Sequence, residues 1–238
     1  MDMQFFPSAA PEVAPALLES CQSEWQLVEI YQHPVFGNQL WIDRDLQISE
    51  SDLAYNTAMT APLLTLPACR RVAILGGGDG GVMNTLLQQA DLLTRELAEV
   101  TLIDIDEAVI ELSKTHLPRL CGDAFTDPRS NVIVGDAFGW LAEARELDAV
   151  IYDLTMEPVN EHTTRAEFMA DILASIHRSL RPGGVISLQA CGASQPDRAR
   201  WLGDLKDQLA VHFGPVYEQE VMVPSYGELW TFLSGTRR

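Results

Sequence analysis

The sequence has few of the features that mark secreted or membrane proteins. Its four cysteines, Cys21, Cys69, Cys121 and Cys191, form neither a C-x-x-C pair nor a group with histidine, which argues against a disulfide framework and a metal site. No apolar run is long enough to span a bilayer, and the first residues lack the basic start of a signal peptide. We therefore expect a cytoplasmic protein without a bound metal.

Basic residues are also scarce, because 16 lysines and arginines stand against 34 acids and give a formal net charge of −18. An acidic surface repels nucleic acid and anionic membranes and attracts small polycations. We therefore expect a small-molecule partner, with no nucleic acid and no membrane. Net charge also serves solubility in proteins of any function, so it does not by itself identify a ligand.

The N-terminal quarter is typical of a small β domain. The first two dozen residues carry three prolines and are expected to form an irregular or partly helical arm. Short alternating segments separated by turn residues then predict antiparallel strands at Gln26–Tyr31, Gln39–Asp43 and Leu46–Ile48. A helix is expected over Asp52–Leu66, with Ser51 or Asp52 as its cap.

From Arg71 onward, apolar segments alternate with segments of helical spacing. The expected strands are Val72–Leu75, Val100–Ile103, Val132–Val134, Ala149–Tyr152 and Val185–Leu188. The expected helices are Gly81–Gln89, Glu107–Leu117, a short one after Ala137, and Ala166–Leu180. This alternation predicts an α/β fold with a parallel sheet and helices on both faces. We expect a β domain over residues 1–58 and a nucleoside-binding domain over residues 59–238.

The segment Gly76-Gly-Gly-Asp-Gly-Gly81 holds five glycines in six residues directly after a predicted strand. Glycine lets bare backbone approach a ligand, and Gly76, Gly78 and Gly81 match a dinucleotide-type spacing. Asp104, at the end of the next strand, is placed to accept ribose hydroxyls. Asp79 puts a negative charge at a helix N-terminus, where a phosphate would otherwise bind. The loop therefore predicts a nucleoside ligand that carries a positive charge.

Carboxylates follow four of the five predicted strands. They are Asp79, Asp104, Asp136 and Asp153, while the fifth strand ends at Gln189. Any one of them is explained more simply as a helix cap. Because ligands of parallel sheets bind at the carboxyl ends of the strands, four acids on one edge favour a binding site.

Several motifs resemble those of the polyamine aminopropyltransferases, the spermidine and spermine synthase family, over about residues 25–232. They are Val35–Asp43, Gln47–Glu50, Gly76–Gly81, Ile103–Ile110, Gly135–Phe138, Asp153 followed by Pro158, Arg181–Gly184, Gln189-Ala190 and Pro224–Tyr226. The resemblance implies a Rossmann-like, methyltransferase-type domain behind a small β domain. It also implies transfer of a 3-aminopropyl group from decarboxylated S-adenosylmethionine, a co-substrate rather than a permanent cofactor, to an amine.

The resemblance also implies roles for single residues. Asp153 corresponds to the catalytic aspartate, which accepts a proton from the attacking amine. The donor site would comprise Gln47 near the methylthio group, Gly76, Gly78, Asp79, Gly81, Asp104, and Asp136 with Ala137 at the adenine. The acceptor groove would be lined by Tyr55, Glu157, Gln189 and Tyr226. Family members often form dimers, so a homodimer is expected.

Two motifs depart from the family pattern. The usual Asp-Ser-Thr-Asp-Pro becomes Asp153-Leu-Thr-Met-Glu157-Pro158, and the usual Tyr-His-Glu becomes Tyr55-Asn-Thr. The acceptor therefore stays open between putrescine and another polyamine. His162, near the altered motif, is read as a surface residue rather than a base. Two alternatives remain, an S-adenosylmethionine-dependent methyltransferase and a non-catalytic homologue that binds a nucleoside or polyamine.

Overall fold

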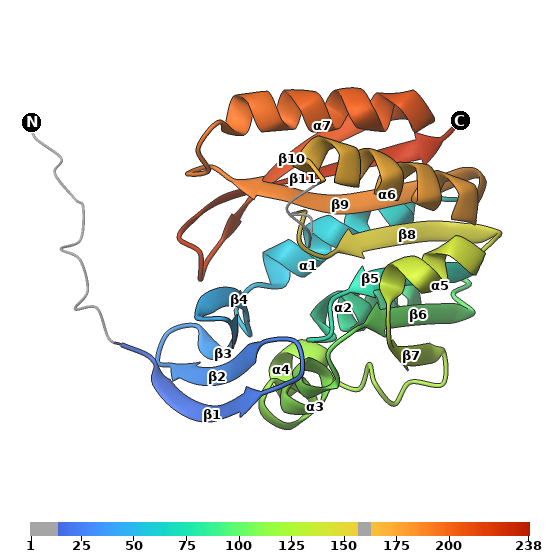
Figure 1. Ribbon diagram of the computed structural model, residues 1–238. Helices are drawn as coiled ribbons and strands as arrows, with labels where there is room; N and C mark the ends of the chain where they lie inside the picture. Colours follow the sequence, from blue (N-terminus) through green and yellow to red (C-terminus); the bar gives the residue numbers. More distant parts are fainter. Residues whose placement is uncertain (1–13, 157–162) are drawn as a thin grey trace, which may run out of the picture.

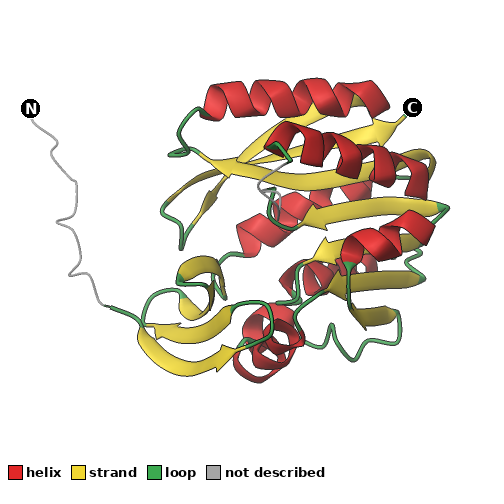
Figure 2. Ribbon diagram, in the orientation of Figure 1, coloured by secondary structure: helices red, strands yellow, loops and turns green. Residues whose placement is uncertain are grey.

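The computed structural model describes residues 14–156 and 163–238, which form two β-sheets with helices around the larger one (Figures 1 and 2). The smaller sheet is antiparallel, with its strands in chain order. They are β1 (Ala16–Gln22), β2 (Leu27–His33), β3 (Gly37–Ile42) and β4 (Asp45–Ser49). The predicted small antiparallel sheet is confirmed.

One expectation for this region was wrong, because residues 16–22 form β1 rather than an irregular or helical arm. The segment Ala-Leu-Leu-Glu-Ser favours a helix by intrinsic propensity. It instead pairs along β2, with Cys21 opposite Val28. Strand preference depends on the neighbouring strand more than on the segment itself, so this pairing overrides the local preference.

The larger sheet has the order β10-β11-β9-β8-β5-β6-β7. Its strands are β5 (Arg71–Gly76), β6 (Glu99–Asp104), β7 (Ser130–Val134), β8 (Leu147–Asp153), β9 (Leu180–Gly192), β10 (Phe213–Val223) and β11 (Glu228–Arg237). Strands β5 to β9 are parallel, as expected, and β10 and β11 add an antiparallel edge. The α/β fold predicted for this part of the chain is confirmed.

Helices cover both faces of this sheet (Figure 2). They are α1 (Leu53–Thr60), α2 (Gly81–Leu92), α3 (Glu107–His116), α4 (Pro118–Cys121), α5 (Ala137–Glu143), α6 (Arg165–Ser179) and α7 (Arg198–His212). In β5, Val72 and Ile74 face the core under α1 and α2, whereas Ala73 and Leu75 face the core under α6 and α7. Burial on both faces explains why these strands are continuous apolar runs.

Helix α1 is shorter than the segment predicted for it. It ends at Thr60 and continues as a 3₁₀ turn over Ala61–Thr65, which contains Pro62, a residue that lacks the amide hydrogen an α-helix needs. Asp52 is the N-cap residue, but its side chain does not cap the helix. No helix in the described ranges is long and apolar enough to cross a membrane. The domain boundary at residue 58 stays a prediction.

Candidate active site

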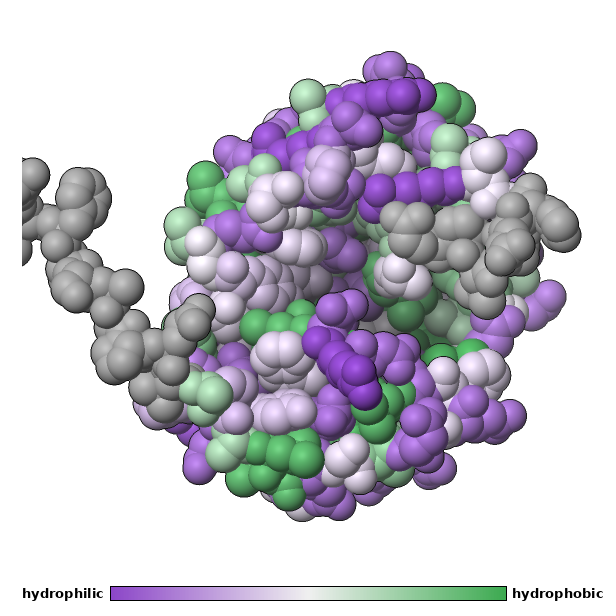
Figure 3. Space-filling model, turned by 60° about the vertical axis from the view of Figure 1, so that its left-hand side comes forward, coloured by the Kyte–Doolittle hydropathy of each residue, from purple (hydrophilic) through white to green (hydrophobic). Residues whose placement is uncertain are grey.

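The carboxyl ends of β5, β6 and β8 meet at one edge of the larger sheet, because β5 lies between the other two strands. Gly76 stands beside Asp153 in the β5–β8 pair, and the glycine loop also reaches Asp104 at the end of β6. Figure 3 turns this side of the molecule forward and shows a hollow in its surface. The structure therefore brings together three of the acids singled out in the sequence, Asp79, Asp104 and Asp153.

The glycine loop is packed too closely for side chains. Gly76 has a φ of +79°, and a Cβ there would lie 2.3 Å from the backbone oxygen of Asp153. A Cβ on Gly78 would lie 2.7 Å from Oδ2 of Asp104, and one on Gly81 would lie 2.8 Å from Oδ1 of Asp79. Glycine is thus required where the loop backbone meets the carboxylates.

Asp104 is held by the loop that it faces. Its Oδ2 accepts a hydrogen bond from the amide of Gly78 (2.9 Å), and its Oδ1 accepts one from the amide of Asp106 (3.0 Å). Burial raises the pKa of Asp104, and these backbone bonds partly offset the increase. The carboxylate is therefore fixed in place beside the loop, as the expected ribose ligand requires.

Asp79 is the acid within the glycine loop, and its pKa is strongly raised. Its Oδ1 accepts a hydrogen bond from the amide of Gly81 (2.7 Å). Burial raises its pKa to about 7, and the nearby charge of Asp153 adds to the increase. A carboxylate with such a pKa is stabilised by a cation that binds next to it.

Asp153 is paired with a tyrosine from the helix that follows the small sheet. The Tyr55 hydroxyl donates a hydrogen bond of 2.6 Å to Oδ1 of Asp153. Burial raises the pKa of Asp153 to about 6, although the bond from Tyr55 lowers it. Burial and the charge of Asp153 raise the pKa of Tyr55 well above its usual value, so the phenol stays a donor. A pKa of about 6 leaves most of the Asp153 carboxyl ionised at neutral pH and suits a general base.

Tyr226 lies against this pair. Its ring meets the Tyr55 ring edge-on at 6.4 Å between centroids and the Trp230 ring at 5.0 Å. Its hydroxyl donates to the backbone oxygen of Gln47. The exposed side chain of Gln47 is bonded to its own strand, at the oxygen of Asp45 (3.1 Å).

Gln189 lies in the neighbouring strand β9, directly after Leu188, which pairs with Tyr152 of β8. It is oriented by two contacts. Its amide nitrogen donates to the backbone oxygen of Leu154 (3.2 Å), and its amide oxygen accepts from the Trp230 indole (3.1 Å). These bonds fix the Gln189 amide next to the residue that follows Asp153. The structure thus gathers Gln189, Tyr226 and Tyr55 around one side of Asp153.

The remaining predicted residues form no hydrogen bond to the group of acids described above, or lie outside the described residues. Asp136 is exposed and caps α5 by accepting from the Phe138 amide (2.9 Å), and Ala137 is buried as the first residue of that helix. Both follow β7, which pairs with β6. Glu157 and His162 lie outside the described residues.

One polar residue at the site was missed in the sequence. Asn56 on α1 is 2% exposed, and its amide nitrogen would lie 2.6 Å from a Cβ placed on Gly81, beside Asp79. In the described part of the chain its side chain forms no hydrogen bond with another residue. The departure from Tyr-His-Glu was the available signal, since Asn56 follows Tyr55 directly.

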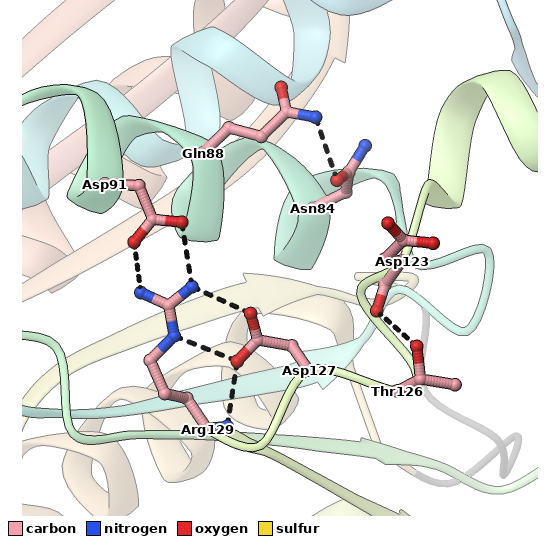
Figure 4. A network of polar contacts seen from close by, with 7 residues as sticks. All are labelled: Asn84, Gln88, Asp91, Asp123, Thr126, Asp127 and Arg129. Atoms are coloured by element: carbon pink, nitrogen blue, oxygen red, sulfur yellow. Dashed lines mark hydrogen bonds and ion pairs between the residues drawn. The ribbon is translucent and has the colours of Figure 1, made fainter.

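A cavity of about 530 Å³ opens at the opposite edge of the sheet, between Arg70, Arg71, Glu99, Arg129 and Asp148. Its cations are already paired. Arg129 binds Asp91 (2.6 Å) and Asp127 (2.7 Å), as Figure 4 shows, and Arg71 faces Glu99 at 3.6 Å. Ligands of parallel sheets bind at the carboxyl edge, so we place the candidate active site there.

Comparisons with known proteins identify the family of the chain. A family model, the spermine/spermidine synthase domain, matches residues 53–237. The polyamine aminopropyltransferase of Nitrosomonas europaea is 33% identical over 219 residues, which cover 90% of this chain and 64% of that protein. Spermidine synthase 2 of Arabidopsis thaliana is 32% identical over 173 residues, 71% of this chain and 48% of that protein. The chain thus spans less than two thirds of the length of these relatives.

Solved structures agree on the fold. The spermidine synthase from Thermotoga maritima superposes with a TM-score of 0.76 at 21% identity, over 94% of this chain and 73% of that one. A spermidine synthase in complex with the transition state analogue AdoDATO gives a TM-score of 0.77, with the same identity and coverage. At this level of identity the likeness concerns the fold alone.

Proposed function

This chain belongs to the spermine/spermidine synthase family, and on that premise we propose that it is an aminopropyltransferase. It transfers a 3-aminopropyl group from decarboxylated S-adenosylmethionine to putrescine or another polyamine and releases 5′-methylthioadenosine. The observation that carries the proposal is the hydrogen bond between Tyr55 and Asp153, whose charge also acts on the nearby Asp79. It combines a base of suitable pKa with a second carboxylate for a cationic substrate.

The donor is held by the glycine loop and the strand ends in this proposal. Asp104 accepts the ribose hydroxyls, and Asp79 pairs with the ammonium that remains after decarboxylation. Asp136 and the backbone at Ala137 bind the adenine, while Gln47 lies toward the methylthio group. Gly76, Gly78 and Gly81 leave room for the nucleoside to approach the backbone.

The reaction needs an unprotonated amine, because a free alkylamine has a pKa of about 10, like that of lysine. Asp153 accepts the proton, and the amine nitrogen then attacks the carbon next to the sulfonium. The carbon–nitrogen bond forms as the carbon–sulfur bond breaks, and its electron pair goes to the sulfur. Tyr55 holds Asp153 in position, so the acid and the attacking nitrogen stay aligned.

Tyr226, Gln189 and Tyr55 line the acceptor side in this proposal, and Glu157 pairs with the distal ammonium of the polyamine. A small polyamine and the donor are the expected partners, with neither nucleic acid nor a membrane involved. We further propose a cytoplasmic homodimer.

The methyltransferase alternative is less well supported. S-adenosylmethionine retains a carboxylate, which would lie close to the Asp79 carboxyl, and like charges at short distance repel wherever Asp79 is ionised. The raised pKa of Asp153 favours a catalytic over a non-catalytic role, because strongly shifted carboxyl pKa values cluster at catalytic sites.

The first prediction separates chemistry from binding. Replacing Asp153 with Asn removes the base with little change of shape, so turnover should fall by about a hundredfold or more, the usual scale of acid–base catalysis. Methylthioadenosine should still bind to this variant. Asp104→Ala should instead weaken methylthioadenosine binding. The measurement is methylthioadenosine release from decarboxylated S-adenosylmethionine and a panel of amines, with calorimetry for binding. Full activity of Asp153→Asn would contradict the proposed mechanism.

A further inference from the structure

Asp52, at the start of α1, is a fully buried acid whose contacts are unrelated to helix capping. Its Oδ2 accepts a hydrogen bond from the Ser49 amide (2.8 Å), which fixes the carboxylate at the end of β4. Its Oδ1 accepts from the Ser225 amide (3.1 Å), and Oδ2 also accepts from the Ser225 hydroxyl. The carboxylate thus joins two segments that are 173 residues apart in the chain.

Ser225 lies in the turn between β10 and β11. In Figure 1 this turn, drawn in red, reaches down toward β4, drawn in blue. The next residue, Tyr226, makes a second contact across the same junction, since its hydroxyl donates to the backbone of Gln47 in β4. Bonds on two consecutive residues leave the turn little freedom, because both its backbone and its side chains are held.

Tyr226 is also the residue of this turn that faces the site. Its ring packs edge-on against Tyr55, whose hydroxyl holds Asp153. A chain of contacts therefore connects Asp52, through Ser225 and Tyr226, to the Tyr55–Asp153 pair. The bonds of Asp52 and Ser225 do not include the donor loop, where the Gly78 amide donates to Asp104 and the Gly81 amide donates to Asp79.

We propose that Asp52 is a positioning residue for the amine acceptor, acting through Ser225 to hold Tyr226 on the acceptor side of the site. This inference rests on the proposed function only for the identity of the ligand. The docked turn itself is a property of the fold. Asp52 and Ser225 together act as a latch that completes the acceptor groove.

The test uses Ser225, whose side chain is smaller than that of Asp52 and whose loss threatens folding less. Ser225→Ala removes the hydrogen bond from its hydroxyl to the Asp52 carboxylate and should raise the acceptor KM by about tenfold or more, as expected for one lost bond to a charged group. The kcat and the Kd for methylthioadenosine should change by less than about twofold. Ser225→Thr keeps the hydroxyl and should restore the KM. Ser51→Ala is the matched control, because the Ser51 hydroxyl touches the same carboxylate at 3.4 Å without reaching the turn.

Hydrogen exchange at residues 225–227 gives a readout that does not depend on catalysis. Ser225→Ala and Asp52→Asn should both speed exchange there, while Ser51→Ala leaves it unchanged. The proposed role of Asp52 would be contradicted by unchanged exchange or by an unchanged acceptor KM. It would also be contradicted if kcat fell and methylthioadenosine binding weakened to the same extent as the acceptor KM rose. If the wild-type protein transferred no aminopropyl group, the proposed function would fail instead. The latch would then be judged by the exchange data and by calorimetric binding of putrescine in the presence of methylthioadenosine.

Discussion

Asp153 illustrates how single residues set the chemistry of this site. Burial raises its pKa to about 6, and the Tyr55 hydroxyl lowers it by stabilising the charged form. Tyr55→Phe removes only that hydroxyl, so the pKa of Asp153 should rise. Because the proposed base acts only when it is ionised, the acidic limb of kcat/KM should move to higher pH.

The measurement is the pH profile of aminopropyl transfer for wild type and Tyr55→Phe. Tyr31→Phe is a suitable control, since the Tyr31 hydroxyl also donates to a carboxylate, that of Glu29 (3.2 Å), but in the small sheet. An acidic limb that stays in place in Tyr55→Phe would show that the tyrosine does not tune the base.

At the scale of elements, the strand–loop–helix unit of β5 and α2 depends on glycine at defined points. Gly76→Ala places a side chain at a φ of +79° and a Cβ 2.3 Å from the backbone oxygen of Asp153. We expect it to lower the free energy of unfolding by about 2 kcal/mol or more. Gly203 lies inside α7 with open space around its Cβ position, so Gly203→Ala should raise that free energy by about 0.5–1 kcal/mol. Chemical denaturation measures the free energy of unfolding of both variants. An unchanged free energy of unfolding in Gly76→Ala would contradict the packing described for the loop.

The elements also mark what the sequence could and could not predict. The glycine loop and the acids after β5, β6 and β8 follow from local patterns, because the ends of parallel strands meet at one edge whatever the details of packing. Strand β1 was missed, because its pairing with β2 is a tertiary contact. The Tyr55–Asp153 bond joins residues 98 positions apart, and the contact of Asp52 with Ser225 is longer still. No local pattern reports such contacts.

At the scale of the whole molecule, the acid cluster reduces the stability of the free protein at neutral pH. The pKa of Asp79 is about 7 in the folded state, against an ordinary value of 3.8, so the folded protein binds the extra proton more tightly. The stabilisation of the folded state by the protonated Asp79 carboxyl is therefore fully present below pH 3.8 and is lost as the pH rises through about 7. Asp79→Asn removes the charge and should raise the Tm more at pH 8 than at pH 5. Thermal unfolding at both pH values measures this, and an equal Tm change would argue against the raised pKa.

The central claim is that this site delivers an aminopropyl group rather than a methyl group to an amine. The most direct measurement offers the protein putrescine together with equal concentrations of decarboxylated and ordinary S-adenosylmethionine, and determines the mass of the amine product. The account predicts an amine extended by an aminopropyl group, with methylthioadenosine as the nucleoside product and no such product from Asp153→Asn. A methylated amine with S-adenosylhomocysteine would contradict it.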